Sequence, residues 1–191
     1  MDKNEFMTKY KMRELREKDG FILDIIYATP NNFTKEILYK TPICMLREKT
    51  AEKLLKANSK LNKLKLKIKI WDAFRPIAYQ YKMWEICPNE NFVANPTKGN
   101  SNHCKGSAID ITLCDFNNNE LKMPTEFDHF GIESYRDYYK NLDDVTRNNV
   151  TLLENTMIEC GFTPFPFEWW HFNDNDNYDT IYEMYEYFLG V

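Results

Sequence analysis

Residues 64–70, which read Leu-Lys-Leu-Lys-Ile-Lys-Ile, alternate strictly between an aliphatic side chain and a lysine. A period of two places the aliphatic side chains on one face of a β-strand and the lysines on the other. This segment is therefore predicted to be a half-buried strand. Its apolar face has to be covered by other elements, so the chain is expected to build a sheet with helices packed against it.

The rest of the chain supplies the other elements of such a fold. Short apolar or β-branched runs predict further strands, at residues 21–27 and 107–114. Residues 162–172 are aromatic and broken by Pro164 and Pro166, which suits a strand approached through a constrained loop. Periodicity, aromatic content or capping residues predict helices, at residues 46–61, 77–86 and 143–160. Segments rich in Pro and Asn are expected to be loops, at residues 27–33, 88–102 and 115–119.

The order of these elements predicts the fold class. Helices and strands follow one another with turns between strands, which is typical of an α+β fold with a small antiparallel β-sheet flanked by helices. The tail at residues 174–191 is expected to be a loop and a terminal helix. The length of 191 residues suits a single domain over residues 1–191.

Composition excludes several classes of protein. Hydrophobic residues make up 43% of the chain, enough to build a core, and no apolar run is long enough to span a bilayer. A net charge of −4 argues against binding to a nucleic-acid backbone, which needs a basic surface. The five cysteines are scattered without a Cys-x-x-Cys pair, and the charged first residues contain no apolar segment of a secretory signal. We therefore expect a cytoplasmic protein that binds neither nucleic acid nor membranes.

Asp110 lies at the centre of the predicted strand 107–114, on the face opposite to its isoleucines. A carboxylate there is costly unless it is paired or coordinates a metal. His103 lies in the loop that leads into the strand, and Gly106 allows the chain to fold back. An imidazole and a carboxylate can thus converge on one cation, although a structural His–Asp pair explains the same pattern.

A second cluster consists of Glu168 and His171, three residues apart in an aromatic stretch. Together the two clusters offer His103, Asp110 and His171 as metal ligands and leave Glu168 free. Three protein ligands with one open position are the pattern of a catalytic zinc site, and Glu168 would take the proton from water there. In a regular strand Glu168 and His171 point to opposite faces, so a bend or helical turn near Trp169 is required.

Arg75 comes just after the alternating strand, and Pro76 fixes the turn that follows. An arginine held at the edge of a site can stabilise a developing oxyanion. Taken alone, each of these features has a simpler explanation: a salt bridge for Arg75, a surface position for His129 and packing for Cys104 and the tryptophans. The joint occurrence of the three clusters favours a catalytic site.

Three motifs in this order resemble the D-alanyl-D-alanine dipeptidase family, of the VanX type. They are D-x-x-R-P at residues 72–76, S-x-H-x-x-G-x-A-x-D at 101–110 and E-W-W-H at 168–171. That family belongs to a wider group of zinc peptidases with D-Ala-D-Ala carboxypeptidases and hedgehog-like domains. The resemblance spans most of the chain, from residue 27 to residue 171, and implies a hedgehog/D-Ala-D-Ala peptidase-like fold.

Carried over residue by residue, the resemblance implies one zinc ion per chain on His103, Asp110 and His171. It implies Glu168 as the general base and Arg75 as the group that stabilises the tetrahedral intermediate. It further places three residues at the substrate, namely Tyr27 in Y-A-T-x-x-N-F, and Ser101 and Asp128 near the free amine of a dipeptide.

The function that the resemblance implies is zinc-dependent hydrolysis of the D-Ala-D-Ala dipeptide in peptidoglycan precursor metabolism. This activity serves either glycopeptide resistance or the recycling of cell-wall fragments. One alternative is a zinc D,D-carboxypeptidase that acts on longer muropeptides. A second is a zinc-bearing binding module without catalysis, against which the presence of both Glu168 and Arg75 argues.

Overall fold

In the part of the chain that the structure describes, five strands form the central sheet, in the spatial order β2-β4-β5-β7-β6. The structure is a computed structural model that describes residues 1–98 and 101–183. All pairs are antiparallel except β2 with β4 at one edge, which are parallel. The strands of this sheet are β2 (Ile22–Leu23), β4 (Leu66–Asp72), β5 (Ala108–Asp115), β6 (Phe162–Pro164) and β7 (His171–Asp174). The fold is thus α+β, with the predicted antiparallel sheet and one parallel edge pair.

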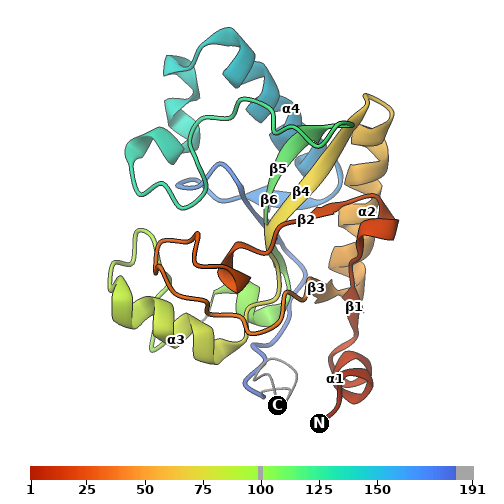
Figure 1. Cartoon of the computed structure of the whole chain (residues 1–191), viewed down its shortest axis with the longest axis vertical. Helices are drawn as coiled ribbons and strands as arrows, with labels where there is room; N and C mark the ends of the chain where they lie inside the picture. The colour runs from red at the N-terminus through yellow and green to blue at the C-terminus, as the bar shows by residue number, and fades with distance from the viewer. Residues whose placement is uncertain (99–100, 184–191) are drawn as a thin grey trace.

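The described residues further contain four α-helices and a second, two-stranded sheet (Figure 1). The helices are α1 (Lys3–Tyr10), α2 (Glu48–Asn62), α3 (Ile77–Ile86) and α4 (Asp144–Glu159). The small antiparallel sheet pairs β1 (Met12–Glu14) with β3 (Met45–Arg47). Short 3-10 turns complete the described chain, η1 (Glu17–Asp19), η2 (Ile26–Ala28), η3 (Asn102–Lys105), η4 (Ile132–Ser134) and η5 (Arg136–Asn141).

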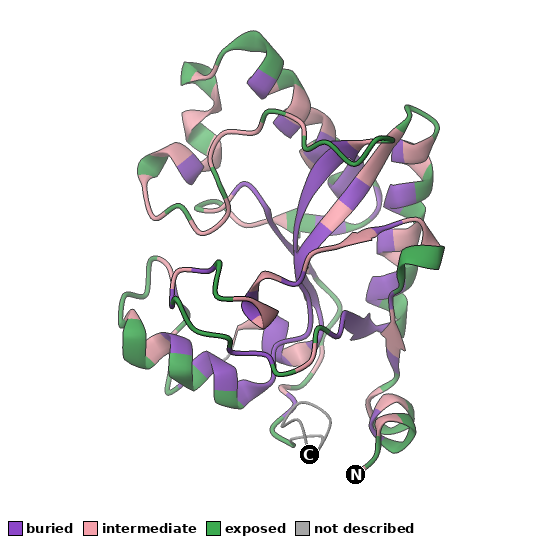
Figure 2. Cartoon of the chain, in the orientation of Figure 1, coloured by how far each residue is buried: buried purple, intermediate pink, exposed green. Residues whose placement is uncertain are grey.

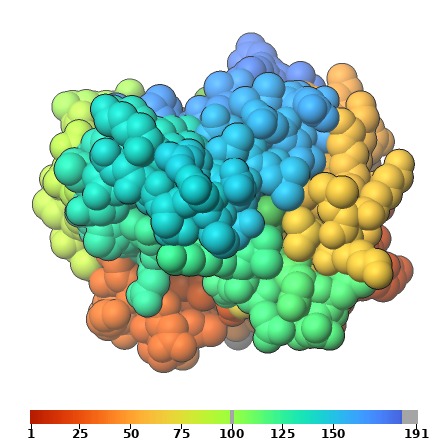
Figure 3. Space-filling model, turned by 90° about the horizontal axis from the view of Figure 1, so that it is seen from above, coloured from red at the N-terminus to blue at the C-terminus, as the bar shows by residue number. Residues whose placement is uncertain are grey.

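Helices α2 and α4 cover the apolar face of the sheet. Leu54, Ala57 and Leu61 of α2 and Leu153 of α4 are fully buried in the same cluster as the isoleucines of the sheet. Figure 2 shows buried residues concentrated on β4 and β5 and on the inner sides of these two helices. In the view from above, α4 and the residues that precede it, coloured teal to blue, lie nearest the viewer (Figure 3). This packing stabilises the sheet by removing apolar surface from water.

Strand β4 has the predicted alternation of buried isoleucines and lysines, but its register is irregular near its end. Ile68 and Ile70 are fully buried and pair with Leu113 and Ile111 of β5. Between Ile70 and Asp72 the register shifts, so that Asp72 pairs with Asp110. Directly paired residues share a face, so this β-bulge turns Asp72 away from the isoleucine face and onto the face of Asp110.

The helix predictions are confirmed closely. The predicted helix at 46–61 is α2, and that at 77–86 coincides with α3. The side chain of Asp143 accepts a hydrogen bond from the backbone N–H of Thr146 and caps α4, as predicted for Asp143 or Asp144. Gly161, with φ of +93°, follows the end of the helix in the left-handed region.

Two strand predictions differ from the structure. The segment 21–27 forms only the two-residue strand β2 and then the 3-10 turn η2, because the chain curls at Ile26 to bury Tyr27. In the segment 162–172 the constrained loop is present at residues 165–170 and leads into β7, but the residues before the loop form a further short strand, β6, which pairs with β7.

The predicted terminal helix is not found where the structure describes the tail. Residues 175–183 are irregular, and residues 184–191 lie outside the described part of the chain. Within residues 1–98 and 101–183, no helix combines the length and the apolar character needed to cross a membrane.

Candidate active site

Strand register brings two of the predicted metal ligands together. Asp110 on β5 pairs directly with His171 on β7. Because paired residues of adjacent strands point to the same face, both side chains lie on the face that the isoleucines do not occupy. His103 reaches the same point from η3, which the αL residue Gly106 (φ +73°) ends before β5 begins.

His103, Asp110 and His171 form a compact cluster whose potential ligand atoms all lie within 4.8 Å of one another. His103 Nε2 is 3.1 Å from His171 Nδ1 and 3.2 Å from Asp110 Oδ2, and His171 Nδ1 is 2.9 Å from Asp110 Oδ1. All three residues are buried. The structure therefore brings the predicted ligand set together in a site that could hold a metal ion.

The outer nitrogens of both imidazoles face backbone or side-chain oxygens. His103 Nδ1 lies 2.7 Å from the carbonyl oxygen of Ala73, and His171 Nε2 lies 3.0 Å from Oδ1 of Asn173. Each oxygen accepts a hydrogen bond, so each outer nitrogen carries the proton and the inner nitrogen presents a lone pair. Two lone pairs and a carboxylate then converge without a proton between them, which is the donor set of a divalent cation.

The charges of the cluster shift the pKa of Asp110 in the direction expected of a metal ligand, whereas the pKa of His103 shifts the opposite way because the carboxylate favours a protonated imidazole. Burial alone would raise the pKa of Asp110, but the two imidazoles outweigh it and hold that pKa well below its usual range. Burial alone would lower the pKa of His103, and the negative charge of Asp110 raises it instead. The carboxylate of Asp110 is therefore ionised at neutral pH, as a metal ligand has to be.

Glu168 lies beside this cluster without belonging to it. The predicted bend is present: residues 169 and 170 form a turn, and the N–H of His171 donates to the carbonyl oxygen of Glu168. Glu168 Oε2 thereby comes to 3.7 Å from His171 Nδ1. Burial and the negative charges of Asp110 and Asp128 raise the pKa of Glu168 to about 8. A cation in the cluster would lower this pKa, because its charge favours the carboxylate form.

Arg75 points into the site from the chain that leaves β4. Its Nε and Nη2 donate to Asp72 Oδ2 at 3.0 and 2.6 Å, and its Nη1 donates to Gln80 Oε1 at 2.8 Å. Asp72 also accepts a hydrogen bond from the hydroxyl of Tyr39 at 2.9 Å. The guanidinium is thus a buried, rigidly held cation that makes the salt bridge given as its simpler explanation, and its functional role stays a prediction.

Tyr27 and Asp128 form one wall of the site. The hydroxyl of Tyr27 lies 3.1 Å from both carboxylate oxygens of Asp128, and the guanidinium carbon of Arg75 lies 5.3 Å from the centre of the Tyr27 ring. Asp128 has φ of +58°, a conformation that non-glycine residues rarely adopt and that is often found at functional sites. Burial and the charge of Asp110 raise its pKa to about 7.

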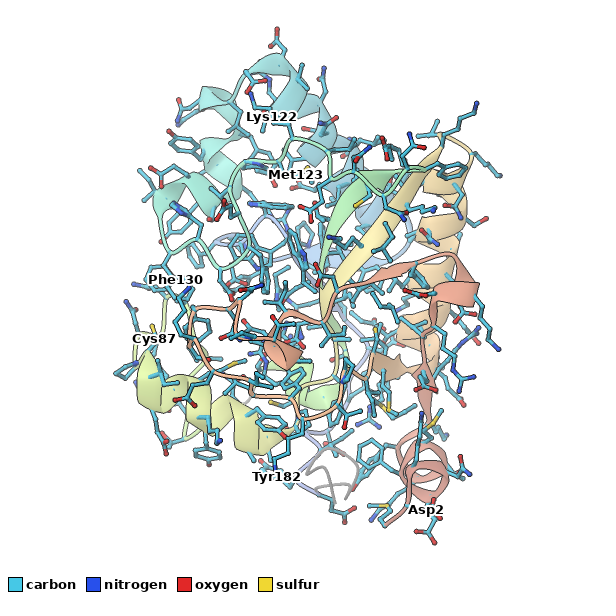
Figure 4. The ribbon with its side chains drawn as sticks, viewed as in Figure 1. Asp2, Cys87, Lys122, Met123, Phe130 and Tyr182 are labelled. Atoms are coloured by element: carbon cyan, nitrogen blue, oxygen red, sulfur yellow. The ribbon has the colours of Figure 1, made fainter. Side chains whose placement is uncertain are left out.

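One cavity of about 230 Å³ is lined by the three potential metal ligands and by Glu168, Arg75, Tyr27 and Asp128. Ser101 also lines it, and its hydroxyl accepts a hydrogen bond from the backbone N–H of His103 at 3.2 Å. Three phenylalanines from separate loops meet along another part of its wall: the Phe92 and Phe130 rings stack at 4.6 Å, and Phe33 meets Phe130 at 5.2 Å. In Figure 4 the loop runs from Lys122 and Met123 down to Phe130, above Cys87 at the end of α3. Segments that precede and follow β5 in the sequence thus contribute to the cavity wall.

The residues assigned no chemistry lie as predicted. His129 is exposed, and its ring pairs with Glu133 at 3.2 Å. Cys104 is fully buried, and Trp169 and Trp170 belong to the core, although Trp170 also lines the cavity.

Sequence reasoning missed the residues that hold the site residues in place. Asp72 was part of a motif but was given no role, and Gln80 and Asn173 were not singled out. A spacing signal existed for Asn173, because residues two apart in a strand share a face and His171 is two residues before it. No local signal existed for Gln80, whose position depends on how α3 packs.

Comparisons with known proteins identify the family of this chain. Residues 14–188 match the model of a peptidase family described as "D-ala-D-ala dipeptidase". The D-alanyl-D-alanine dipeptidase of Escherichia coli is 34% identical over 150 residues, covering 78% of this chain and 77% of that protein. The one of Enterococcus faecalis is 28% identical over 187 residues, covering 86% of this chain and 92% of that protein.

A search of solved structures found the vancomycin-resistance D,D-pentapeptidase VanY in complex with Zn(II). It is 14% identical, with a TM-score of 0.46, over 69% of this chain and 73% of that chain. The family match, in contrast, extends across the cavity and all of its polar residues, and one relative exceeds 30% identity over three quarters of the chain. The family match and this identity together show that the chain belongs to the D-ala-D-ala dipeptidase family of metallopeptidases.

Proposed function

We propose that this protein is a zinc-dependent dipeptidase that hydrolyses D-Ala-D-Ala, and that residues 1–191 form one domain holding one zinc ion. The observation that carries the proposal is the convergence of two imidazole nitrogens and one carboxylate beside a second carboxylate, that of Glu168, which is outside the cluster. His103, Asp110 and His171 are the ligands in this proposal. A zinc ion at such a site supplies a Lewis acid and lowers the pKa of water.

The protein's own residues perform the proton transfer and the charge stabilisation. Glu168, 3.7 Å from His171 Nδ1, accepts a proton from the attacking water and passes it to the leaving amine. Arg75 donates to the oxygen that gains negative charge, and its fixed position means that little reorganisation is needed.

The cavity wall supplies recognition of a small zwitterion. The carboxylate of Asp128 and the hydroxyl of Tyr27 lie together in the cavity wall, where they can bind the free amine of a dipeptide, and Ser101 adds a second hydroxyl to this wall. The cavity holds about 230 Å³, and Phe33, Phe92 and Phe130 form part of its wall, so a short peptide fits it better than an extended chain. This size favours a dipeptidase over a carboxypeptidase for longer muropeptides.

The wider role follows from the substrate. Hydrolysis of D-Ala-D-Ala removes a peptidoglycan precursor, in glycopeptide resistance or in cell-wall recycling. The five cysteines are free, and four of them are buried, which suits a reducing compartment and supports a cytoplasmic location.

A dipeptide panel tests the proposed function. D-Ala-D-Ala, L-Ala-L-Ala and a D-Ala-D-Ala-terminated tripeptide are offered to the protein, with zinc and after chelation. We expect turnover of D-Ala-D-Ala alone, lost on chelation and restored by zinc. Preference for the tripeptide would assign a carboxypeptidase, and no turnover of any peptide by the zinc-loaded protein would leave a binding module.

Acetylation of the substrate amine is expected to lower kcat/KM roughly 10- to 100-fold. The physical reason is that a hydrogen bond between charged groups contributes about 1.5–3 kcal/mol, and acetylation removes the charge that Asp128 recognises. The measurement is the rate with D-Ala-D-Ala and with its N-acetyl form, for the wild type and for Asp128→Asn. The variant should discriminate less between the two. Equal rates with the wild type would favour the carboxypeptidase.

Replacing Arg75 with lysine is expected to slow turnover roughly a hundredfold without loss of zinc. Lysine keeps a positive charge beside the buried Asp72 but cannot reproduce the two-pronged donor geometry of the guanidinium. Loss of one donor to a developing oxyanion costs about 3 kcal/mol. The rate and the zinc content are measured on one preparation. The control is Arg147→Lys, because Arg147 forms an exposed ion pair with Asp144. A rate within threefold of the wild type would exclude this role.

A further inference from the structure

Asn173 contacts the proposed metal ligand His171 at the ring nitrogen that faces away from the cluster. It is two residues after His171 on β7, so both side chains point to the same face. Its Oδ1 is 3.0 Å from His171 Nε2. Its cross-strand partner on β5 is Ala108, whose small side chain leaves room for the amide.

A second asparagine fixes which atom of this amide faces the imidazole. Nδ2 of Asn102 donates to the same Oδ1 of Asn173 at 2.8 Å. An amide nitrogen in that place would set two donors against each other, so the oxygen of Asn173 is held toward both partners. Asn102 belongs to η3, the segment of His103, and the pair therefore links the two segments that carry the histidines.

We propose that Asn173, held by Asn102, is a positioning residue that sets the tautomer and the ring orientation of His171 and thereby the zinc affinity of the site. The carbonyl oxygen accepts the Nε2 proton, which leaves the lone pair on Nδ1. Nδ1 is the atom that faces Asp110 Oδ1 at 2.9 Å and His103 Nε2 at 3.1 Å. Partners of this kind typically change metal affinity 10- to 100-fold. The inference rests on the proposed zinc site, but not on the identity of the peptide substrate.

Zinc affinity measures the effect directly. The dissociation constant is determined by competition with a chromophoric chelator at neutral pH, for the full-length wild type, Asn173→Leu and Asn173→Asp. Leucine has a similar volume without an acceptor, and we expect zinc to bind roughly 10- to 100-fold more weakly. Aspartate keeps the acceptor, and we expect an affinity within about threefold of the wild type. Asn175→Leu, at an exposed position two residues further on, is the matched control and should bind zinc normally.

A spectroscopic readout separates positioning from simple packing. Long-range nitrogen–proton NMR spectra of the imidazoles report the tautomer of His171 in the metal-free protein, which should be Nε2–H in the wild type and in Asn173→Asp. If Asn173→Leu does not fold, Asn173→Ala replaces it, because alanine only removes atoms.

The inference is overturned if the folded leucine or alanine variant binds zinc within twofold of the wild type, or if Asn173→Asp loses as much affinity as the leucine variant. Failure of the proposed function gives a different result. A wild type that binds zinc tightly but hydrolyses no D-Ala-D-Ala would refute the dipeptidase and leave the role of Asn173 standing. A wild type that binds no zinc would refute both.

Discussion

Replacing Glu168 with glutamine is expected to lower kcat roughly 10²- to 10⁴-fold while the protein keeps its zinc and its fold. Positioned general acid–base groups contribute rate factors of this size. Glutamine has nearly the same shape, but it cannot accept a proton from water or return one to the leaving amine. The ligand set is complete without Glu168, so removal of its charge leaves His103, Asp110 and His171 in place.

The experiment compares turnover of D-Ala-D-Ala with zinc content on the same preparation. Glu133→Gln is the matched control, since Glu133 is exposed and pairs with His129 away from the cavity. This control should show normal turnover. A near-normal rate for Glu168→Gln would assign the base to another group in the cavity, such as Asp128, and would refute the mechanism.

Replacing His171 with alanine is expected to reduce the zinc content from about one equivalent to a small fraction of one. Only His103 and Asp110 remain of the three proposed ligands, and water would have to replace the third around the metal ion. Turnover should fall with the zinc content, so this variant is poor in metal and inactive, whereas Glu168→Gln is rich in metal and slow. Elemental analysis after dialysis, together with the rate, distinguishes the two kinds of residue.

His129→Ala is the matched control for the metal experiment. This variant also removes one imidazole, but the ring of His129 is exposed and pairs with Glu133. It should retain full zinc and full activity. Full zinc occupancy in His171→Ala, with the circular dichroism spectrum of the wild type, would show that the ligand set is wrong.

Local patterns in the sequence determined several elements of this fold. The alternation at residues 64–70 predicted most of β4, and the helical periodicity at 46–61 predicted α2. The cap at Asp143 and the glycine at 161 marked the ends of α4. These succeed because side-chain periodicity and capping are short-range properties, decided by residues a few positions apart.

The spacing of polar residues also predicted the members of the site. Asp110 on the polar face of its strand and Glu168 three residues before His171 were both readable, including the bend that the second pair requires. Motif resemblance added Tyr27, Ser101 and Asp128, all of which line the cavity. The roles of these residues stay predictions until the experiments above are done.

Only the tertiary structure decided how these residues meet. The pairing of Asp110 with His171 depends on β7 lying beside β5, which is a long-range register that no local period encodes. The bulge before Asp72 turns that carboxylate toward Arg75, and the packing of α3 brings Gln80 to the same guanidinium. Asn173 acquires its contact with His171 Nε2 through the face that β7 presents. Periodicity thus selects which face of an element is polar, whereas contacts between distant segments decide which polar groups come within hydrogen-bonding distance.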